Sequence, residues 1–151
     1  MKGYTFAAKK SESVAKARGR ELHISPKKAY EVMNAIRGLP LEDAKSLLED
    51  VVELKRAIPF RRYNQETAHK RGIGPGRYPK KVAQQVLIVL QNAEANAEDE
   101  GLNVDDAYIK VAAASRGRLI KAIMPRAQGR STPWNEETTN LEIILAEKGK
   151  S

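Results

Sequence analysis

Two β-type runs near the C-terminus, separated by a long turn-rich segment, limit the fold more than any other feature of the sequence. Residues 108–111 and 141–145 are rich in β-branched and aliphatic side chains, and the prolines and glycine of 124–133 favour a reversal of the chain. Each leg of the resulting hairpin would hold about 17 residues, or about 56 Å at roughly 3.3 Å per residue. A compact domain of this length has a radius of gyration of only about 15 Å. We therefore expect an extended β-hairpin over 108–145 that protrudes far beyond the globular body.

The outer part of this hairpin has no core of its own. A two-stranded ribbon is only marginally stable in water without further packing. The segment 107–135 also contains six basic residues and no acidic residue. The ribbon therefore needs a partner to hold it, and an anionic partner fits its charge. Five of the six basic residues lie in the outer part, namely Arg116, Arg118, Lys121, Arg126 and Arg130.

Upstream of the hairpin, hydrophobic periodicity predicts three helices. The first begins at residues 25–26, with Ser as N-cap and Pro at the first helical position, and Gly38 ends it. The second begins near Pro40, and the third covers about 79–100. A short strand is expected at 22–24. The chain therefore combines helices and strands in an α+β fold.

The length of 151 residues fits one domain of ordinary size. We expect residues 1–151 to form a single domain with two basic appendages besides the hairpin. Residues 1–16 resemble a basic arm, and residues 55–78, rich in Arg, Gly and Pro, resemble a basic loop that becomes ordered on binding.

Charge is distributed in blocks along the chain. The sequence holds 27 Lys and Arg residues against 19 Asp and Glu residues, a formal net charge of +8. Residues 55–81 contain nine basic residues and one acidic residue, whereas 91–106 contain six acidic residues and no basic one. Such alternation indicates basic faces that touch an anion and acidic faces that look at solvent. Binding to a phosphate backbone favours acid-free basic segments, because each neutralised phosphate releases counterions.

The sequence offers little for catalysis, metal binding or membrane insertion. It contains no cysteine, which removes disulfides, thiolate nucleophiles and Cys-based metal sites. His23 and His69 stand in no metal-ligand spacing, and the glycines of 72–76 lack the Gly-Lys-Ser/Thr ending of a phosphate-binding loop. Apolar stretches fall well short of the roughly 18 residues that cross a bilayer. We expect a soluble intracellular protein with no cofactor, no metal, no small-molecule substrate and no membrane partner.

Nucleic acid is therefore the expected partner. Aromatic residues make up only 5% of the chain, so base stacking cannot be the main binding mode. Recognition of the shape and the phosphates of a folded RNA fits better. Two alternatives stay open: an architectural DNA-binding protein whose β-ribbon arm enters the minor groove, and an enzyme of RNA metabolism, for which only the glycine-rich segment speaks.

Three motifs occur in one order along the chain: AKARGRELHISPKKAYEVMNAIRGLPLEDA (15–44), VLQNAEANAE (89–98) and IKAIMPRAQGR (120–130). In this order they closely resemble the large-subunit ribosomal proteins of the L22 family. The segments KRAIPFRRYN (55–64) and GRYPKK (76–81) look like an insertion of the archaeal and eukaryotic branch of that family. The resemblance extends over most of the chain.

This resemblance implies a small α+β body, with three helices packed on a three-stranded antiparallel sheet and a long protruding β-hairpin. It implies a structural protein of the cytoplasmic ribosome, not an enzyme, which binds 23S-type rRNA and contacts neighbouring ribosomal proteins. The hairpin tip would form part of the wall of the polypeptide exit tunnel and meet the nascent polypeptide transiently.

The expected site residues follow from the basic segments and from the match to the family motifs. The residues expected to bind rRNA are Lys16, Arg18, Arg20, Lys27, Lys28, Arg61, Arg62, Arg71, Arg77, Lys80, Arg116, Arg118, Lys121, Arg126 and Arg130. The residues expected to line the tunnel are Met124, Pro125, Arg126, Ala127, Gln128, Gly129 and Arg130.

Overall fold

The computed structural model describes residues 4–6 and 13–147 of the chain. Three helices and eight strands follow one another along these residues, with one short 3-10 turn at the tip of the hairpin. In chain order they are β1 (Val14–Leu22), α1 (Pro26–Ile36), α2 (Leu41–Val52), β2 (Ile58–Pro59), β3 (His69–Lys70), β4 (Gly74–Arg77), α3 (Lys80–Asp99), β5 (Ala107–Ile120), β6 (Ile123–Pro125), the turn Ala127–Gly129, β7 (Ser131–Pro133) and β8 (Glu136–Glu147).

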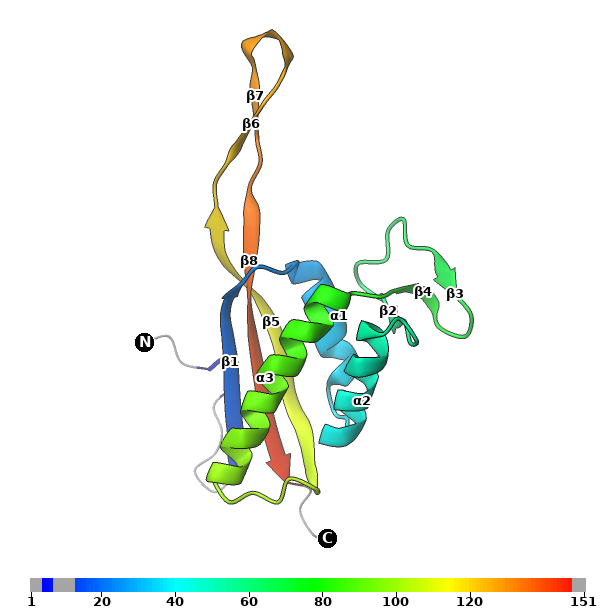
Figure 1. Cartoon of the computed structure of the whole chain (residues 1–151), viewed down its shortest axis with the longest axis vertical. Coiled ribbons are helices and arrows are strands. Elements are labelled where there is room, and N and C mark those ends of the chain that lie inside the picture. Colours follow the sequence, from blue (N-terminus) through cyan, green and yellow to red (C-terminus); the bar gives the residue numbers. More distant parts are fainter. Residues whose placement is uncertain (1–3, 7–12, 148–151) are drawn as a thin grey trace.

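The main sheet has three antiparallel strands in the order β1-β8-β5 (Figure 1). Its central strand, β8, places Ile143 opposite Ala17 of β1 and opposite Ala112 of β5. Successive side chains of a strand point to opposite faces, so Leu141, Ile143 and Leu145 share the face that carries the main core. The expected α+β architecture, three helices with a three-stranded antiparallel sheet, is confirmed.

The three helices bury their apolar stripes against this face and against one another. Helix α1 packs on β5, whereas α3 crosses β1 and β8 and supports α2 on its other side (Figure 1). Between α2 and α3, the Nζ atom of Lys45 lies 2.6 Å from a carboxylate oxygen of Glu94 and 3.0 Å from one of Glu42. Burial alone would lower the pKa of Lys45, but the two carboxylates outweigh it and raise the pKa above its ordinary value.

The helix boundaries agree with the sequence signals, while the first strand does not. Ser25 occupies the N-cap position of α1 and Pro26 its first turn, although the Ser25 side chain makes no capping hydrogen bond. The expected strand at 22–24 is wrong, because β1 ends at Leu22 and the chain bends away beyond it. Strand β1 also takes in the last residues of the expected arm 1–16, since Val14 is buried. The rest of that arm lies largely outside the described residues.

The C-terminal hairpin rises from the main sheet and extends well beyond the body, as the sequence predicts (Figure 1). Strands β5 and β8 pair along their length, and β6 pairs with β7 beyond a break. The chain reverses at the tip, where Gln128 and Gly129 have φ angles of 61° and 66°. Gly129 adopts this left-handed conformation at no steric cost, which explains a glycine at the turn.

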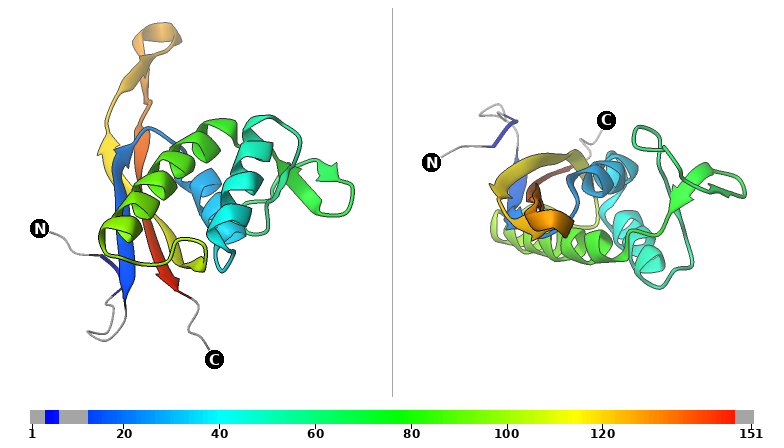
Figure 2. Two further views of the ribbon diagram at one scale, coloured as in Figure 1. Left: turned by 60° about the horizontal axis from the view of Figure 1, so that its bottom comes forward. Right: turned by 90° about the horizontal axis from the view of Figure 1, so that it is seen from above.

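Residues 55–78 form a second projection, which we call the lateral extension (Figure 2). Within it, β2, β4 and β3 make a small antiparallel sheet. The expectation of a loop that becomes ordered only on binding needs correction, because Ile58 and Phe60 are buried in the main core. The free chain therefore already holds the near end of this segment in place.

Candidate nucleic-acid interface

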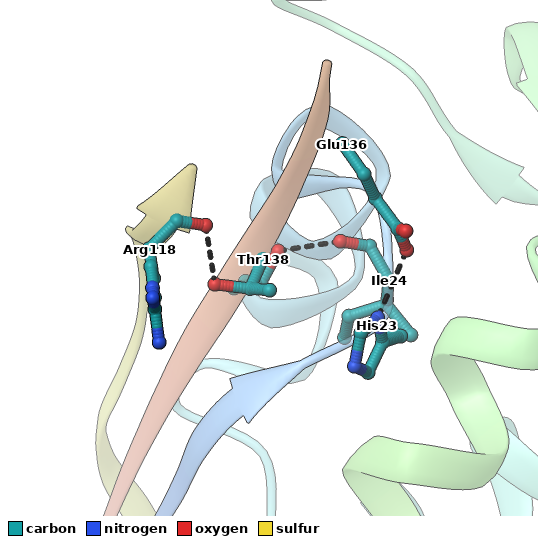
Figure 3. Close-up of polar contacts among 6 residues, drawn as sticks. His23, Ile24, Arg118, Glu136 and Thr138 are labelled. Atoms are coloured by element: carbon teal, nitrogen blue, oxygen red, sulfur yellow. Dashed lines mark hydrogen bonds and ion pairs between the residues drawn. The ribbon is translucent and has the colours of Figure 1, made fainter. Parts of the chain in front are cut away.

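The base of the long hairpin is fixed to the body by side-chain hydrogen bonds. The Thr139 hydroxyl is buried and donates to the backbone carbonyl of Ile24 at 2.7 Å. Figure 3 shows this region, where the Thr138 hydroxyl donates to the carbonyl of Arg118 at 2.8 Å. Nearby, Nδ1 of His23 lies 2.9 Å from a carboxylate oxygen of Glu136. The Thr139 and His23 contacts tie the hairpin to the connection between β1 and α1, so its direction is set by the body, and the Thr138 bond joins the two hairpin strands.

A glycine permits the bend of the outgoing strand at the same level. The register of β5 against β8 shifts between Arg116 and Leu119. A Cβ atom added to Gly117 would lie 2.5 Å from the Thr138 hydroxyl oxygen, too close for any other residue without a shift. The irregularity therefore follows from the local sequence, and such bulges bend and twist a ribbon.

Beyond this bulge the hairpin is exposed on all sides. The five predicted basic residues of its outer part, Arg116, Arg118, Lys121, Arg126 and Arg130, are all exposed. Four large apolar side chains are exposed with them: Leu119, Ile120, Ile123 at 73% and Trp134 at 60%. An isolated ribbon with this surface has no core of its own, so the geometry calls for a partner that packs along it.

Intramolecular contacts along the outer hairpin are few and weak. Arg116 Nε lies 3.6 Å from a carboxylate oxygen of Glu137, and both side chains are solvent-exposed. At the tip, Arg126 Nε donates to the Thr132 hydroxyl at 3.2 Å, and the backbone N–H of Arg126 donates to the carbonyl of Arg130 at 2.8 Å. The predicted tunnel-lining residues 124–130 therefore form one closed turn, in which Met124 is half-buried and the other six are exposed.

The lateral extension is held to α1 by one buried carboxylate. Glu31 is 1% exposed, and its two oxygens accept hydrogen bonds from three successive backbone N–H groups. Their N···O distances are 3.2 Å for Arg61, 2.8 Å for Arg62 and 2.8 Å for Tyr63. These bonds satisfy the buried carboxylate and hold the backbone of the three residues in place.

Aromatic rings and cations gather at this junction. The guanidinium carbon of Arg62 lies 5.1 Å from the ring centroid of Tyr30 and 5.5 Å from that of Tyr63. A hydrogen bond with the Tyr30 side chain raises the pKa of Arg62 above its ordinary value. Lys27 Nζ lies 5.9 Å from the Tyr63 ring centroid, and Arg77 lies 5.8 Å from that of Phe60. The geometry thus brings together predicted residues that are far apart in the sequence.

The remaining predicted residues lie on separate surfaces. On β1, Arg18 keeps only 16% of its side chain exposed and lies 3.4 Å from the buried carboxylate of Glu142. Arg20 is exposed, and Lys16 lies over the ring of Tyr4 at 5.8 Å. The other predicted residues are exposed: Lys28 in α1, Arg71 at the far turn of the lateral extension and Lys80 at the start of α3. The basic residues therefore form several contact areas and not one continuous patch.

The sequence did not reveal the role of Glu31 or of the aromatic residues at the junction. Glu31 stands beside the apolar stripe of α1, and no local pattern separates it from an ordinary solvent-facing glutamate. The chain has few aromatic residues, and three of them, Tyr30, Phe60 and Tyr63, come together only in the folded structure.

Other kinds of site find no support in the described part of the chain. Residues 4–6 and 13–147 contain no group of His, Asp and Glu side chains that could hold a metal ion. None of the helices described is long and apolar enough to cross a membrane. Gly74 and Gly76 lie in β4, where Gly76 is buried and pairs with Pro59 of β2, and Gly72 lies in the turn before it.

A small α+β body with two exposed basic projections is typical of a structural nucleic-acid-binding protein. The model of the family described as ribosomal protein L22p/L17e matches residues 17–146, and the chain belongs to this family. It is accordingly a ribosomal protein and not an enzyme.

Individual relatives agree with this assignment. The chain is 51% identical over 138 residues to the large ribosomal subunit protein uL22 of Methanococcoides burtonii, with 91% of each chain covered. It is 50% identical over 141 residues to that of Methanopyrus kandleri, covering 91% of this chain and 89% of the relative. The protein of Archaeoglobus fulgidus is 49% identical over 144 residues, with 93% of each chain covered. The predicted resemblance to the L22 family and to its archaeal branch is confirmed.

Proposed function

We propose that the chain is a structural component of the large ribosomal subunit that binds large-subunit rRNA through distributed Arg and Lys contacts. We also propose that its hairpin tip forms part of the wall of the nascent-polypeptide exit tunnel. The observation that carries both proposals is the long, exposed, acid-poor hairpin. It extends beyond the body and has no core of its own to stabilise it. In this function the protein resides with ribosomes in the cytoplasm.

Binding to rRNA is supported by the spread of the basic side chains. Exposed cations occur on the hairpin and on the lateral extension, which project from the body in different directions (Figures 1 and 2), and at the start of α1 beside the lateral extension. Such a distribution suits several RNA segments better than one straight duplex. The names of the relatives, large ribosomal subunit proteins, favour this reading over an architectural DNA-binding protein.

The tunnel proposal is supported by the chemistry of the tip. Arg126 and Arg130 flank the turn and can contact phosphates. Between them, Ala127, Gln128 and Gly129 are small or neutral, so they offer no strong apolar grip to a moving peptide. The partners are therefore large-subunit rRNA, neighbouring ribosomal proteins and, transiently at the tip, the nascent polypeptide.

Photocross-linking from Gln128 tests the tunnel proposal. A photoreactive residue placed at Gln128 in assembled ribosomes should cross-link to a stalled nascent chain. The matched control places the same residue at Gln91, an exposed glutamine on α3 in the body, where no cross-link to the nascent chain is expected. Absence of a cross-link from Gln128, while a neighbouring tunnel protein does cross-link, would defeat the assignment.

A further inference from the structure

We propose that the cavity between the start of α1 and the lateral extension binds one unstacked nucleotide of RNA. This inference rests on the proposed rRNA binding, and it adds a specific nucleotide pocket to the distributed phosphate contacts. The cavity measures about 630 Å³, within the range of about 300–1,000 Å³ typical of small-molecule sites. We call it the junction pocket.

The walls of the junction pocket carry the groups that recognise a nucleotide. Tyr63 supplies aromatic surface, while Arg62, Arg77 and the two lysines of α1, Lys27 and Lys28, supply positive charge. Phe60 forms the buried floor, 2% exposed, with Arg77 over its ring. The lining therefore contains four cationic side chains and a single carboxylate, that of Glu66. This balance favours a ligand that is both planar and anionic.

A stacking platform for a base is already assembled where Arg62 and Tyr63 line the pocket, and the Tyr30 ring supports them from outside its lining. The Tyr30 and Tyr63 rings meet edge to face, with centroids 5.8 Å apart and planes at 88°. Arg62 lies over both rings yet remains solvent-exposed. Exposed guanidinium planes and aromatic rings are the surfaces on which proteins stack single-stranded bases.

The rest of the pocket suits the backbone and the edge of such a base. Lys27 and Lys28 stand on the first turn of α1, and Arg77 ends β4 on the other side. These cations can contact the phosphates on either side of an extruded nucleotide. Gln65 and Ser25, which also line the pocket, offer amide and hydroxyl groups for hydrogen bonds to a base edge.

The pocket is preorganised in the free chain. The Glu31 carboxylate accepts hydrogen bonds from the backbone N–H groups of Arg62 and Tyr63. Phe60, just before them in the chain, is buried in the core. Fewer groups must therefore become ordered when the nucleotide binds. Four of the eight aromatic residues of the chain, Tyr30, Phe60, Tyr63 and Tyr78, belong to α1 and to the lateral extension and its end. Stacking is therefore a local mode here, despite the low overall aromatic content.

Cross-linking and a charge-preserving substitution together test the proposal. A transcript of the large-subunit rRNA, containing 4-thiouridine at random positions, is bound to the full chain and irradiated. We expect an adduct on residues 60–63, joined to a nucleotide that chemical probing shows to be unpaired. Arg62→Lys keeps the positive charge but removes the planar guanidinium, so it should weaken binding about tenfold and abolish this adduct. Tyr63→Leu should have a similar effect.

Arg56→Lys is the matched control, because Arg56 is an exposed arginine of the same extension, lines a different cavity and is not among the residues expected to bind rRNA. We expect it to change the affinity less than twofold. Circular dichroism and the thermal midpoint report whether each variant is folded, and Arg62→Lys retains the backbone bonds to Glu31.

Several outcomes would overturn the pocket while leaving the proposed function intact. Equal effects of Arg62→Lys and Arg56→Lys, or an adduct only to paired nucleotides, would mean that the site contacts phosphates alone. Loss of the adduct when about 1 mM adenosine monophosphate, a concentration matching an ordinary small-molecule affinity, is present before irradiation would assign the pocket to a free nucleotide. A cross-link to a neighbouring protein in intact subunits, from a photoreactive residue placed at Arg62, would assign the pocket to a protein partner. Failure of the wild-type chain to bind the transcript at all would instead contradict the proposed function.

Discussion

The backbone N–H of Tyr63 donates a 2.8 Å hydrogen bond to Oε1 of Glu31, a residue 32 positions earlier in the chain. The same oxygen accepts from the N–H of Arg62 at 2.8 Å. One buried carboxylate on α1 therefore determines the path of the lateral extension as it leaves the core. Because a carboxylate accepts several hydrogen bonds and donates none, no other side chain of similar size replaces it without loss.

Glu31→Gln should destabilise the fold and loosen the lateral extension. The amide retains one acceptor oxygen but turns an N–H₂ group toward backbone donors, so at least one charge-assisted bond is lost. Such bonds contribute about 1.5–3 kcal/mol, and we expect a decrease of about 2 kcal/mol in the free energy of unfolding. Urea denaturation measures this change, and hydrogen exchange should show lost protection at the amides of 61–63.

Glu49→Gln serves as the control for this substitution, since Glu49 is an exposed glutamate on α2. Its effect on stability should stay within about 0.5 kcal/mol. If both variants were equally stable, the hydrogen bonds of Glu31 would not hold the extension as we infer.

Limited proteolysis should distinguish the two ends of the lateral extension. Arg71 lies in an exposed turn between β3 and β4, whereas Arg61 and Arg62 have backbone groups bonded to Glu31. Trypsin should therefore cleave the free chain after Arg71 well before it cleaves after Arg61 or Arg62, because cleavage requires local opening. Bound rRNA should slow cleavage at all three sites. Equal rates at Arg61 and Arg71 in the free chain would contradict the described anchoring.

The elements with local signals could be predicted from the sequence. The helices have 3.6-residue periodicity and terminal Pro or Gly residues, and the hairpin follows from two β-type runs around a turn. The protrusion of the hairpin needed only the rise per residue of a strand and the size of a compact domain. These features depend on residues that are neighbours in the chain.

The contacts that shape the candidate site depend on residues far apart in the chain. The pairing of Arg18 with Glu142 makes a predicted surface cation largely buried. The clustering of Tyr30 with Tyr63 requires the extension to return to α1, which the buried Glu31 enforces. The sequence predicts the first strand too late, because the glycine and basic residues of β1 mask its apolar residues Val14, Ala15 and Ala17. No pattern within a short window carries this information.

The salt dependence of rRNA binding should reflect many phosphate contacts. If about ten Lys and Arg residues contact phosphates, the logarithm of the affinity should fall with the logarithm of the salt concentration with a slope of about −7 to −9. Arg118→Gln, on the exposed hairpin, removes one phosphate contact and should make the slope shallower by about 0.7 to 0.9. Lys45→Gln should leave it unchanged, because Lys45 is paired with Glu94 between α2 and α3. A wild-type slope shallower than about −2 against cognate rRNA would contradict distributed phosphate binding.

Thr139→Val should destabilise the attachment of the hairpin to the body. Valine has nearly the same shape as threonine, so the buried packing at this position is retained. The substitution removes the hydroxyl that donates to the Ile24 carbonyl at 2.7 Å. An unsatisfied buried carbonyl costs about 1–3 kcal/mol, and the free energy of unfolding should fall by that amount. Hydrogen exchange should accelerate at residues 22–25 and 136–139, where the hairpin meets the body, more than in α2.

Thr132→Val is the control on the outer hairpin, where the hydroxyl only accepts a 3.2 Å bond from exposed Arg126, and its effect should be within about 0.5 kcal/mol. If the two substitutions cost the same, the Thr139 bond would not be what fixes the base of the hairpin.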